Sequence, residues 1–422
     1  MLETFRNAWR IEDIRKKIIY TLIMLLVYRL GSFVPIPFVD VDVIQEIVKK
    51  GGEGLLGFFN TLSGGALENF TIFAMSITPY INATIIMQLL TVAIPRLEQL
   101  AKEGEEGRKK IAQYSRYATI ILAFLQAFGI TYGLAHQALV YKNIFVYLFV
   151  ALTLTAGTAF LMWLGEQITE KGIGNGISLM IFVNIVSRAP GQIFRLVVAS
   201  VQGAINWLYL PFITVFMVLL IAGVIFIDMG QRRVPVQYSK RVVGRKMYGG
   251  QSTHIPMKVN SSGVLPVIFA VSILSVPQTI AQFTSTDSGF YKWVDKWMSY
   301  TSWPYAVVYA LLIIFFTFFY TQITFNPIEI SNNLRQYGGF VQGIRPGKPT
   351  ADYLARISTR LTLVGSLFLA VVAIIPIAVA AVTKINMAFG GTSILIMVGV
   401  ALETSKQLES QMLMRHYKGF LK

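Results

Sequence analysis

The sequence predicts an all-α membrane protein that crosses the bilayer ten times. Of its 422 residues, 54% are hydrophobic and 14% are charged, and the mean hydropathy is +0.58. Soluble domains carry about 25% charged residues, so this chain has too few polar side chains to cover a surface in water. Apolar runs of span length recur along the chain, and Lys and Arg gather in alternate connections between them.

Ten apolar runs approach the roughly 20 residues that a helix needs to cross the hydrocarbon layer. They lie at 18–33, 72–94, 118–134, 144–164, 177–186, 208–227, 264–280, 305–325, 361–382 and 394–402. We expect helices, because lipid offers no partner to backbone polar groups and no closed-barrel alternation is present. The fifth and tenth runs are short, so polar flanks or neighbouring helices must complete these crossings.

The distribution of Lys and Arg predicts the orientation. If the N-terminus is cytoplasmic, the inside connections hold most of the 37 Lys and Arg residues. The outside connections then hold only Lys49, Lys50, Lys142, Arg188, Arg195, Lys292, Lys296 and Lys384. Because cytoplasmic loops of membrane proteins carry the excess of positive charge, we predict that both termini are cytoplasmic.

Ten spans divide into two halves of five, residues 1–205 and 206–422. A repeat with an odd number of spans inverts on duplication, so the halves would be related by an axis in the membrane plane. The second and fifth spans of each half carry matching irregularities, namely Pro79 against Pro266 and Pro277, and glycine-rich entries at 172–178 and 389–394. Such segments point to a central pathway, although Pro and Gly are also simply common in membrane helices.

Chemistry-bearing side chains are scarce, which excludes several classes of function. The chain has no cysteine, and its three histidines lie far apart, so we expect no metal site, no cofactor and no catalytic thiol. No nucleophile and base are paired, so we predict that the protein is not an enzyme. Only Arg29 lies well inside a span, paired within the bundle or reaching for the interface, whereas ion-coupled transporters need ionisable groups near the midplane. The spans instead favour a pathway sealed by apolar side chains.

Two cytoplasmic connections are long and basic. Segment 231–262 alternates Val234, Val236 and Tyr238 and has a second extended stretch at 253–259, which predicts a β-hairpin. Segment 326–360 is the other. Their charge either serves membrane topology alone or forms a docking surface for an acidic or RNA-rich partner.

The outer connection after the first span contains an apolar segment, 55–67, that is too short to cross the membrane and contains several glycines. It is either an interfacial helix or a re-entrant segment, and a re-entrant segment is tolerated only inside a protein-lined cavity.

A series of short motifs follows the chain in order, and together they resemble the SecY family, the channel subunits of the bacterial protein translocon. They are ITPYI at 77–81, QLLT at 88–91, KEGE at 102–105, LGEQIT at 164–169, GIGNGIS at 172–178, GQRR at 230–233, QSTH at 251–254, FNP at 325–327, GIRPG at 343–347, RLTL at 360–363 and GGTS at 390–393. The similarity extends from about residue 18 to residue 411 and leaves out only two outer loops and the C-terminal tail.

The resemblance implies two five-helix halves around a central hourglass pore. Its waist would be a ring of aliphatic side chains from the second, fifth, seventh and tenth helices, namely Ile77, Ile81, Ile177, Ile181, Ile268 and Ile396. Segment 55–67 corresponds to a plug that closes the channel, with the residues Leu55, Leu56, Phe58, Phe59, Leu62, Ser63, Gly64, Gly65 and Leu67. A lateral gate would open between the second and third helices on one side and the seventh and eighth on the other, with Asn82, Val276 and Ile280 at its rim.

The resemblance also implies partners and a location. The basic loops correspond to docking sites for the ribosome and the motor ATPase SecA, through Arg232, Arg233, Lys240, Arg241, Arg245, Lys246, Arg345 and Lys348. Small membrane subunits, SecE and SecG, would flank the channel, which would also bind signal sequences, nascent chains and membrane lipids in the bacterial plasma membrane. We expect a passive protein-conducting channel driven by its partners. The alternative from another class is a small-solute secondary transporter, which ten inverted spans could also build.

Overall fold

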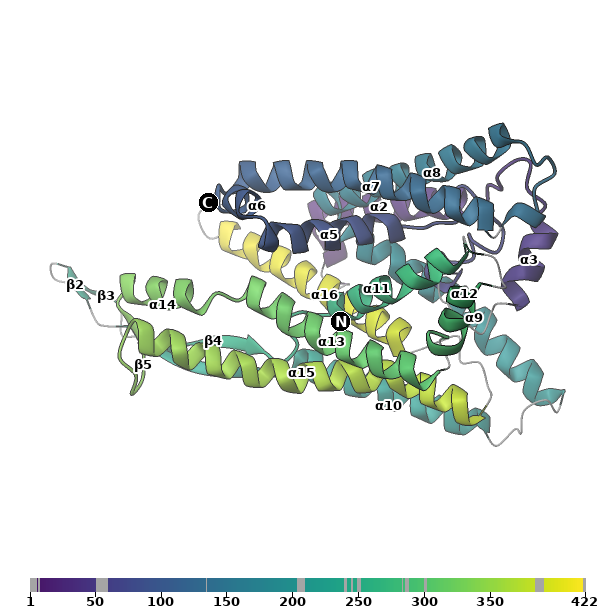
Figure 1. Cartoon of the computed structure of the whole chain (residues 1–422). Helices are drawn as coiled ribbons and strands as arrows, with labels where there is room; N and C mark the ends of the chain where they lie inside the picture. Colours follow the sequence, from purple (N-terminus) through teal and green to yellow (C-terminus); the bar gives the residue numbers. More distant parts are fainter. Residues whose placement is uncertain are drawn as a thin grey trace.

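The structure, a computed structural model, describes residues 6, 8–50, 60–133, 135–202, 209–238, 241–243, 246–248, 252–282, 284, 288–299, 302–383 and 391–419. Its long helices run side by side in one bundle, with α3 and α12 at one end and α14 with the strands at the other (Figure 1). The helices up to residue 202 are α2 (Glu12–Gly31), α3 (Val41–Lys50), α5 (Thr78–Ala93), α6 (Pro95–Lys102), α7 (Glu105–Gly133), the 3-10 helix η1 (Ala135–Gln137), α8 (Ile144–Lys171) and α9 (Gly176–Val201). Those after it are α10 (Tyr209–Met229), α11 (Leu265–Gln282), α12 (Gly289–Trp297), α13 (Trp303–Thr324), α14 (Pro327–Gln336), α15 (Lys348–Thr383) and α16 (Gly391–Gly419).

The predicted apolar runs coincide with helices. Within the described ranges, the greater part of each of the ten runs lies on a helix, namely α2, α5, α7, α8, α9, α10, α11, α13, α15 and α16. Among the described residues, the helices at α8, α10, α13 and α15 could cross a membrane by length and composition alone, and the bent pair α5–α6 brings the number to five if it is one span. The chain is therefore an all-α membrane protein, and the number of ten crossings stays a prediction.

Polar flanks complete the two short runs. Helix α9 has 26 residues and α16 has 29, although the apolar runs that predicted them cover only 177–186 and 394–402. In α16 the apolar half is followed by a charged half from Glu403 onward. Each of these two helices is therefore long enough to cross the membrane, although only its first part is apolar.

The second run begins later than its sequence indicates. Residues 72–77 form turns, and α5 starts at Thr78 with Pro79 in its first turn. Proline is well placed there, because the first turn of a helix has no intrahelical partner for its N–H groups. In the other half, Pro277 lies inside α11. Pro79 therefore lies in the first turn of its helix, whereas Pro277 lies inside a helix that continues to Gln282.

The two halves repeat a packing pattern. In the first half, α5 packs against α7, α7 against α8, α8 against α9 and α2 against α9. In the second, α11 packs against α13, α13 against α15, α15 against α16 and α10 against α16. These are the same four relations when spans are numbered from the start of each half. The halves meet where α9 contacts α16 and α10, and where α11 contacts α5 and α7.

A small β-sheet lies outside the helix bundle. Strand β1 (Gln231–Tyr238) pairs antiparallel with β4 (Ser252–Lys258), which confirms the predicted hairpin. Strand β1 also pairs with β5 (Gly339–Val341) from the second basic segment, giving the order β4-β1-β5. Two further short strands, β2 (Arg241–Val243) and β3 (Lys246–Tyr248), pair with each other.

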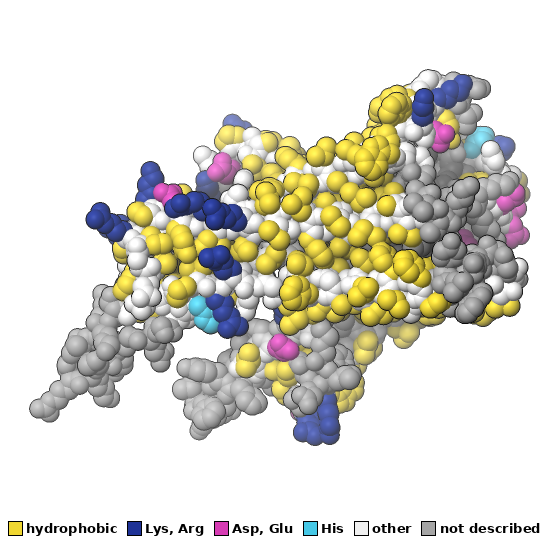
Figure 2. Space-filling model, turned by 90° about the horizontal axis from the view of Figure 1, so that it is seen from below, with side chains coloured by type: hydrophobic (Ala, Val, Ile, Leu, Met, Phe, Trp, Pro, Cys, Tyr) yellow, Lys and Arg dark blue, Asp and Glu magenta, His cyan; other side chains and the backbone are white. Residues whose placement is uncertain are grey.

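The surface carries the pattern of a membrane protein. On the face shown in Figure 2, hydrophobic side chains cover the middle of the bundle, and the largest group of Lys and Arg lies at the end that carries the sheet. Large apolar side chains such as Phe145, Phe226 and Leu311 are more than half exposed. An apolar band of this extent on a soluble protein would drive aggregation, so it is the surface that faces lipid.

Candidate functional site

The six isoleucines of the predicted ring belong to one hydrophobic cluster. Ile77, Ile181 and Ile396 are buried in it, at 1%, 5% and 1% exposure. The other three, Ile81, Ile177 and Ile268, are partly buried and pack against the same cluster. The structure thus brings together side chains from α5, α9, α11 and α16, which are the second, fifth, seventh and tenth of the predicted spans. Their role as a pore ring is an inference from this placement.

All six isoleucines lie at the beginnings of their helices. Ile77 is the residue before α5, and the others fall within the first two turns of α5, α9, α11 and α16. Asn175 fixes the start of α9, because its side-chain oxygen accepts hydrogen bonds from the backbone N–H groups of Ile177 at 3.1 Å and Ser178 at 3.2 Å. The glycine-rich entry that drew attention in the sequence is therefore a helix cap beside the cluster.

The described part of the plug segment packs onto the same cluster. Ala66 is buried within it, and Leu62 packs against it. Ser63 and Leu67 are also buried, at 1% and 4% exposure. Residues 60–67 are therefore inside the bundle, and an interfacial helix on the outer surface does not describe them.

Internal hydrogen bonds give the segment its shape. The Gly65 N–H donates to the Asn60 carbonyl at 2.9 Å, and the Ser63 hydroxyl donates to the same carbonyl at 3.1 Å. Gly64 and Gly65 have φ of +65° and +95°, values that only glycine adopts without strain. The four remaining plug residues of the prediction, Leu55, Leu56, Phe58 and Phe59, lie outside the described residues.

Arg29, the charged residue inside the first span, is paired within the bundle. Its Nη1 donates to the Gly64 carbonyl at 3.1 Å, and its guanidinium lies 5.2 Å from the centroid of the Phe33 ring. A cation over an aromatic face and a carbonyl acceptor together compensate part of the lost hydration.

The predicted lateral-gate residues line one cavity. Asn82, Val276 and Ile280 all border a space of about 440 Å³ between α5, α7 and α11. Asn82 is 9% exposed, whereas Val276 and Ile280 are about half exposed, at 49% and 52%. The eighth predicted span, α13, contributes no residue to this lining. The cavity therefore lies between the second, third and seventh predicted spans, and the eighth does not border it.

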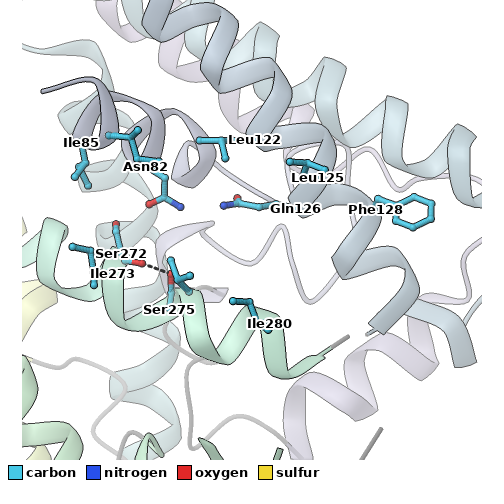
Figure 3. A pocket seen from close by; sticks show the side chains of 12 residues that line it. Asn82, Ile85, Leu122, Leu125, Gln126, Phe128, Ser272, Ile273, Ser275 and Ile280 are labelled. Atoms are coloured by element: carbon cyan, nitrogen blue, oxygen red, sulfur yellow. Dashed lines mark hydrogen bonds between the residues drawn. The ribbon is translucent and has the colours of Figure 1, made fainter. Parts of the chain in front are cut away.

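Polar side chains inside this cavity are functional candidates that sequence reasoning missed. Gln126 on α7 and Ser272 and Ser275 on α11 line it together with Asn82, and Asn82 and Gln126 point toward each other across it (Figure 3). The Ser275 hydroxyl donates to the Ser272 carbonyl at 2.6 Å. Among the described residues, Asn82 Oδ1 is buried without a hydrogen-bond partner. In the sequence, the signal for these residues was only that they are polar side chains within three largely apolar runs.

The predicted docking residues are only partly described. Arg232 and Arg233 are exposed on β1, and Arg345 and Lys348 are exposed between β5 and the start of α15. Arg241 and Lys246 lie on β2 and β3. Lys240 and Arg245 lie outside the described residues. Pairing of β1 with β5 places Arg232, Arg233 and Arg345 on one small domain.

The loop that presents Arg345 is held by side-chain hydroxyls that donate to its backbone carbonyls. Gly343 and Gly347 bracket it with φ of +80° and +98°. The Thr350 hydroxyl donates to the Arg345 carbonyl at 2.8 Å, and the Ser331 hydroxyl donates to the Gly347 carbonyl at 2.7 Å. The motif GIRPG therefore forms a fixed turn whose arginine side chain is directed to solvent.

Arg232 also borders a cavity that two further arginines share. Arg356 and Arg360, on successive turns of α15, line the same space of about 150 Å³ with Tyr353. Neither arginine was among the predicted docking residues. Their spacing of four residues puts them on one helix face, a signal that the sequence did contain.

Comparison with known proteins agrees with this arrangement. The chain matches the SecY family over residues 71–405. A protein from Halalkalibacterium halodurans named Protein translocase subunit SecY is 48% identical over 433 residues, and the match covers 100% of both chains. Proteins of the same name from Streptomyces galbus and Thermotoga maritima are 47% and 43% identical, with 100% of this chain covered and 100% and 98% of theirs.

Two solved structures share the fold. One, described as the structure of a protein conducting channel, has a TM-score of 0.65 and 21% identity, covering 93% of this chain and 91% of the other. The other is Sec61 in the canine ribosome-channel complex from the endoplasmic reticulum, with a TM-score of 0.62 and 20% identity over the same shares. The alternative of a small-solute secondary transporter finds no support among these relatives. With matches of 43–48% identity along its whole length, the chain belongs to the SecY family of protein translocase subunits.

Proposed function

We propose that the chain forms a protein-conducting channel in the bacterial plasma membrane, which passes unfolded polypeptides across the membrane and releases apolar segments sideways into it. The observation that supports this most directly is the cluster of six isoleucines from α5, α9, α11 and α16, against which the segment 60–67 is packed. The cluster is the waist of the channel, and the segment is its plug.

The chemistry of the waist suits a moving polypeptide. Branched aliphatic side chains offer no hydrogen-bonding or charged group to which a passing chain could bind. The same ring excludes water when it is empty and resists ions, since a hydrocarbon-like constriction presents a barrier of several kcal/mol to a charge. A ring of isoleucines therefore seals the closed channel without trapping its passenger.

The cavity between α5, α7 and α11 is the lateral gate. Its outer rim, with Val276 and Ile280, is apolar and half exposed, and its interior holds Asn82 and Gln126. A passenger segment at this opening compares the channel with lipid. Each Leu at the membrane centre gains about 0.5 kcal/mol there, and each Lys loses roughly 3 kcal/mol, so apolar segments leave sideways while polar ones pass through.

The two halves, 1–205 and 206–422, enclose this pathway between them. The repeated packing of neighbouring spans supports this division. The orientation follows from the charge distribution, with both termini and the sheet domain in the cytoplasm.

The energy for transport comes from partners, because the sequence offers no catalytic constellation of its own. The basic sheet domain with Arg232, Arg345 and Lys348 docks the ribosome through rRNA phosphates and docks the motor ATPase SecA. The small membrane subunits SecE and SecG complete the channel. The solved structures support a ribosome partnership, since one neighbour is Sec61 in a ribosome-channel complex.

Purification from the native membrane followed by reconstitution tests this function. The chain should bring down small single-span membrane subunits, and vesicles that contain the complex should import a secretory precursor when SecA and ATP are supplied. Import that proceeds equally without the chain would contradict the proposal. Uptake of a small solute in place of the precursor would restore the transporter alternative.

A further inference from the structure

Side chains from two helices, α2 and α9, contact the plug segment and the residue that follows it. Arg29 of α2 donates to the Gly64 carbonyl at 3.1 Å. Arg188 of α9 forms an ion pair with Glu68, with 3.0 Å between Nη2 and Oε2, and both side chains are 18% exposed. Arg188 is one of the few cations of the predicted outer connections, and such residues are ordinarily solvated. Here it turns inward, toward the segment that fills the pathway.

The glycines of the plug let these side chains approach closely. A Cβ atom at Gly65 would lie 2.1 Å from Arg188 Nη2, and one at Gly64 would lie 2.6 Å from Asn184 Oδ1 and 2.9 Å from Arg29 Nη1. The two glycines therefore serve a second purpose beyond their positive φ. They leave room for three polar groups that rest directly on the turn.

Asn60 completes the ionic contact on the plug side. Its Nδ2 donates to Glu68 Oε2 at 3.1 Å, and its Oδ1 accepts from the Glu68 N–H at 3.1 Å and from Arg188 Nη2 at 3.4 Å. The Glu68 carboxylate is thus held by the amide beside it and by the guanidinium from α9. The bonds to Arg188 join this part of the chain to α9, whereas the bonds between Asn60 and Glu68 are local.

Asn184, one turn before Arg188, makes a second contact of the same kind. Its Nδ2 donates to the Leu62 carbonyl at 2.6 Å and to the buried Tyr28 hydroxyl of α2. Among the described residues its Oδ1 is buried without a hydrogen-bond partner. Helix α9 therefore contacts the plug at Leu62 and the residue directly after it, Glu68, on either side of the Gly64–Gly65 turn.

We propose that Arg188 and Asn184 are positioning residues that clamp the plug shut, and that separation of Arg188 from Glu68 is the step that frees it. The inference rests on the proposed function, since it needs segment 60–67 to be a plug. The clamp determines how strongly a signal sequence must act to open the channel. A weaker clamp accepts weaker signals and leaks more ions.

The physics of a sheltered ion pair defines a distinctive signature. Two charges that are both removed from water gain little net stability from each other, but removal of one leaves the other without an opposite charge in this ion pair, at a sheltered site. Single neutral substitutions should therefore loosen the plug more than the double substitution.

The test uses a cysteine reporter in this naturally cysteine-free chain. Ala66→Cys places a thiol at a position that is 1% exposed, and the complex with its membrane subunits is reconstituted in vesicles. The rate of labelling by a membrane-impermeant maleimide is measured in the resting channel and during precursor import. We expect Glu68→Gln and Arg188→Gln each to raise the resting rate roughly tenfold, equivalent to about 1.4 kcal/mol. The double variant should lie closer to the parent, and Arg188→Lys should keep most of the parent's protection.

Two results overturn the clamp. The first is a resting rate in Glu68→Gln and Arg188→Gln equal to that of the parent, while import still exposes the reporter thiol. In that case the plug assignment stands and the clamp falls. The second is faster labelling in the variants with no change during import in the parent, because the segment is then held but does not move, and the proposed plug falls too. The control is Glu98→Gln, which removes an exposed ion pair with Lys102 on α6 and should leave labelling unchanged.

Discussion

Val236 of β1 lies opposite Val341 of β5 in an antiparallel pair, and both side chains are buried, at 0% and 3% exposure. This contact joins the two basic segments, which are far apart in the sequence, into one sheet. A small hydrophobic core forms beneath it from Val234, Met257 and Leu354. The docking residues are therefore presented by a folded unit and not by two independent loops.

Val341→Asp should detach β5 and disorder the docking surface. An unpaired carboxylate in this small core destabilises it by roughly 3–5 kcal/mol, whereas the helix bundle has its own core. We expect faster proteolysis within 231–262 and loss of SecA-driven import, with normal membrane insertion. Gln237→Asp is the control, because Gln237 is exposed on β1, the strand that pairs with β5. Normal import by Val341→Asp would mean that the sheet does not support docking.

Arg345→Glu should cripple SecA-driven import while the protein stays folded and inserted. The side chain is exposed on a turn whose carbonyls accept hydrogen bonds from the Thr350 and Ser331 hydroxyls, so charge reversal changes the surface and not the fold. Import rates in reconstituted vesicles measure the effect. Lys142→Glu, an exposed position at the opposite end of the molecule, serves as the control. Unchanged rates in Arg345→Glu would exclude this residue from the motor contact.

Ribosome binding should weaken steeply as salt rises. Contacts between Lys or Arg and rRNA phosphates release condensed counterions, and this release becomes less favourable as the salt concentration of the solution rises. Cosedimentation at increasing salt gives the slope, which should become shallower in Arg232→Gln and Arg356→Gln. Binding that does not change with salt would mean that the charge of these segments serves topology alone.

Replacement of two or more ring isoleucines by Ser should let ions leak through the resting channel. Polar side chains hydrate the waist and lower the barrier that an apolar constriction presents. The change should also relax the demand for a strongly apolar signal sequence. Conductance of the purified channel in planar bilayers measures the leak, with Ile77→Ser/Ile181→Ser as the first variant.

Two isoleucines outside the ring are possible controls for this experiment, Ile313 on α13 and Ile375 on α15. Ile313 is fully buried in the core of the second half, so a polar replacement there would destabilise the fold. Ile375 is only partly buried and packs against that core, so Ile375→Ser is the better control and should not leak. A ring variant as tight as the parent would refute the ring.

Asn82→Leu should stabilise the closed lateral gate. Its Oδ1 is buried without a partner among the described residues, and an unsatisfied buried polar atom costs about 1–3 kcal/mol. An apolar side chain removes that penalty from the closed state only. We expect precursors with weakly apolar signal sequences to be imported more slowly, while strong signals are little affected. If Asn82→Leu imports precursors with weak and with strong signal sequences at the same rates as the parent does, Asn82 is not part of the gate.

The helices and the hairpin were predictable because their signals are local. Each apolar run marks a helix, and the alternation of Val234 and Val236 marked β1 correctly. The strand β5 was not predictable, because three residues at 339–341 carry too little pattern and their partner is distant in the sequence. The start of α5 at Thr78 was also missed, since the apolar residues 72–77 continue the run although they form turns.

For the site, spacing alone placed Ile77 with Ile81, and Ile177 with Ile181, on one helix face each. The family resemblance assigned all six isoleucines to one ring, and the structure brings them into one cluster. The clamp of Arg188 on Glu68 had no local signal at all. Hydropathy and charge are properties of each residue by itself, so both can be read directly along the sequence. Which apolar face meets protein and which meets lipid depends on packing between helices, because lipid and a neighbouring isoleucine are almost equally apolar.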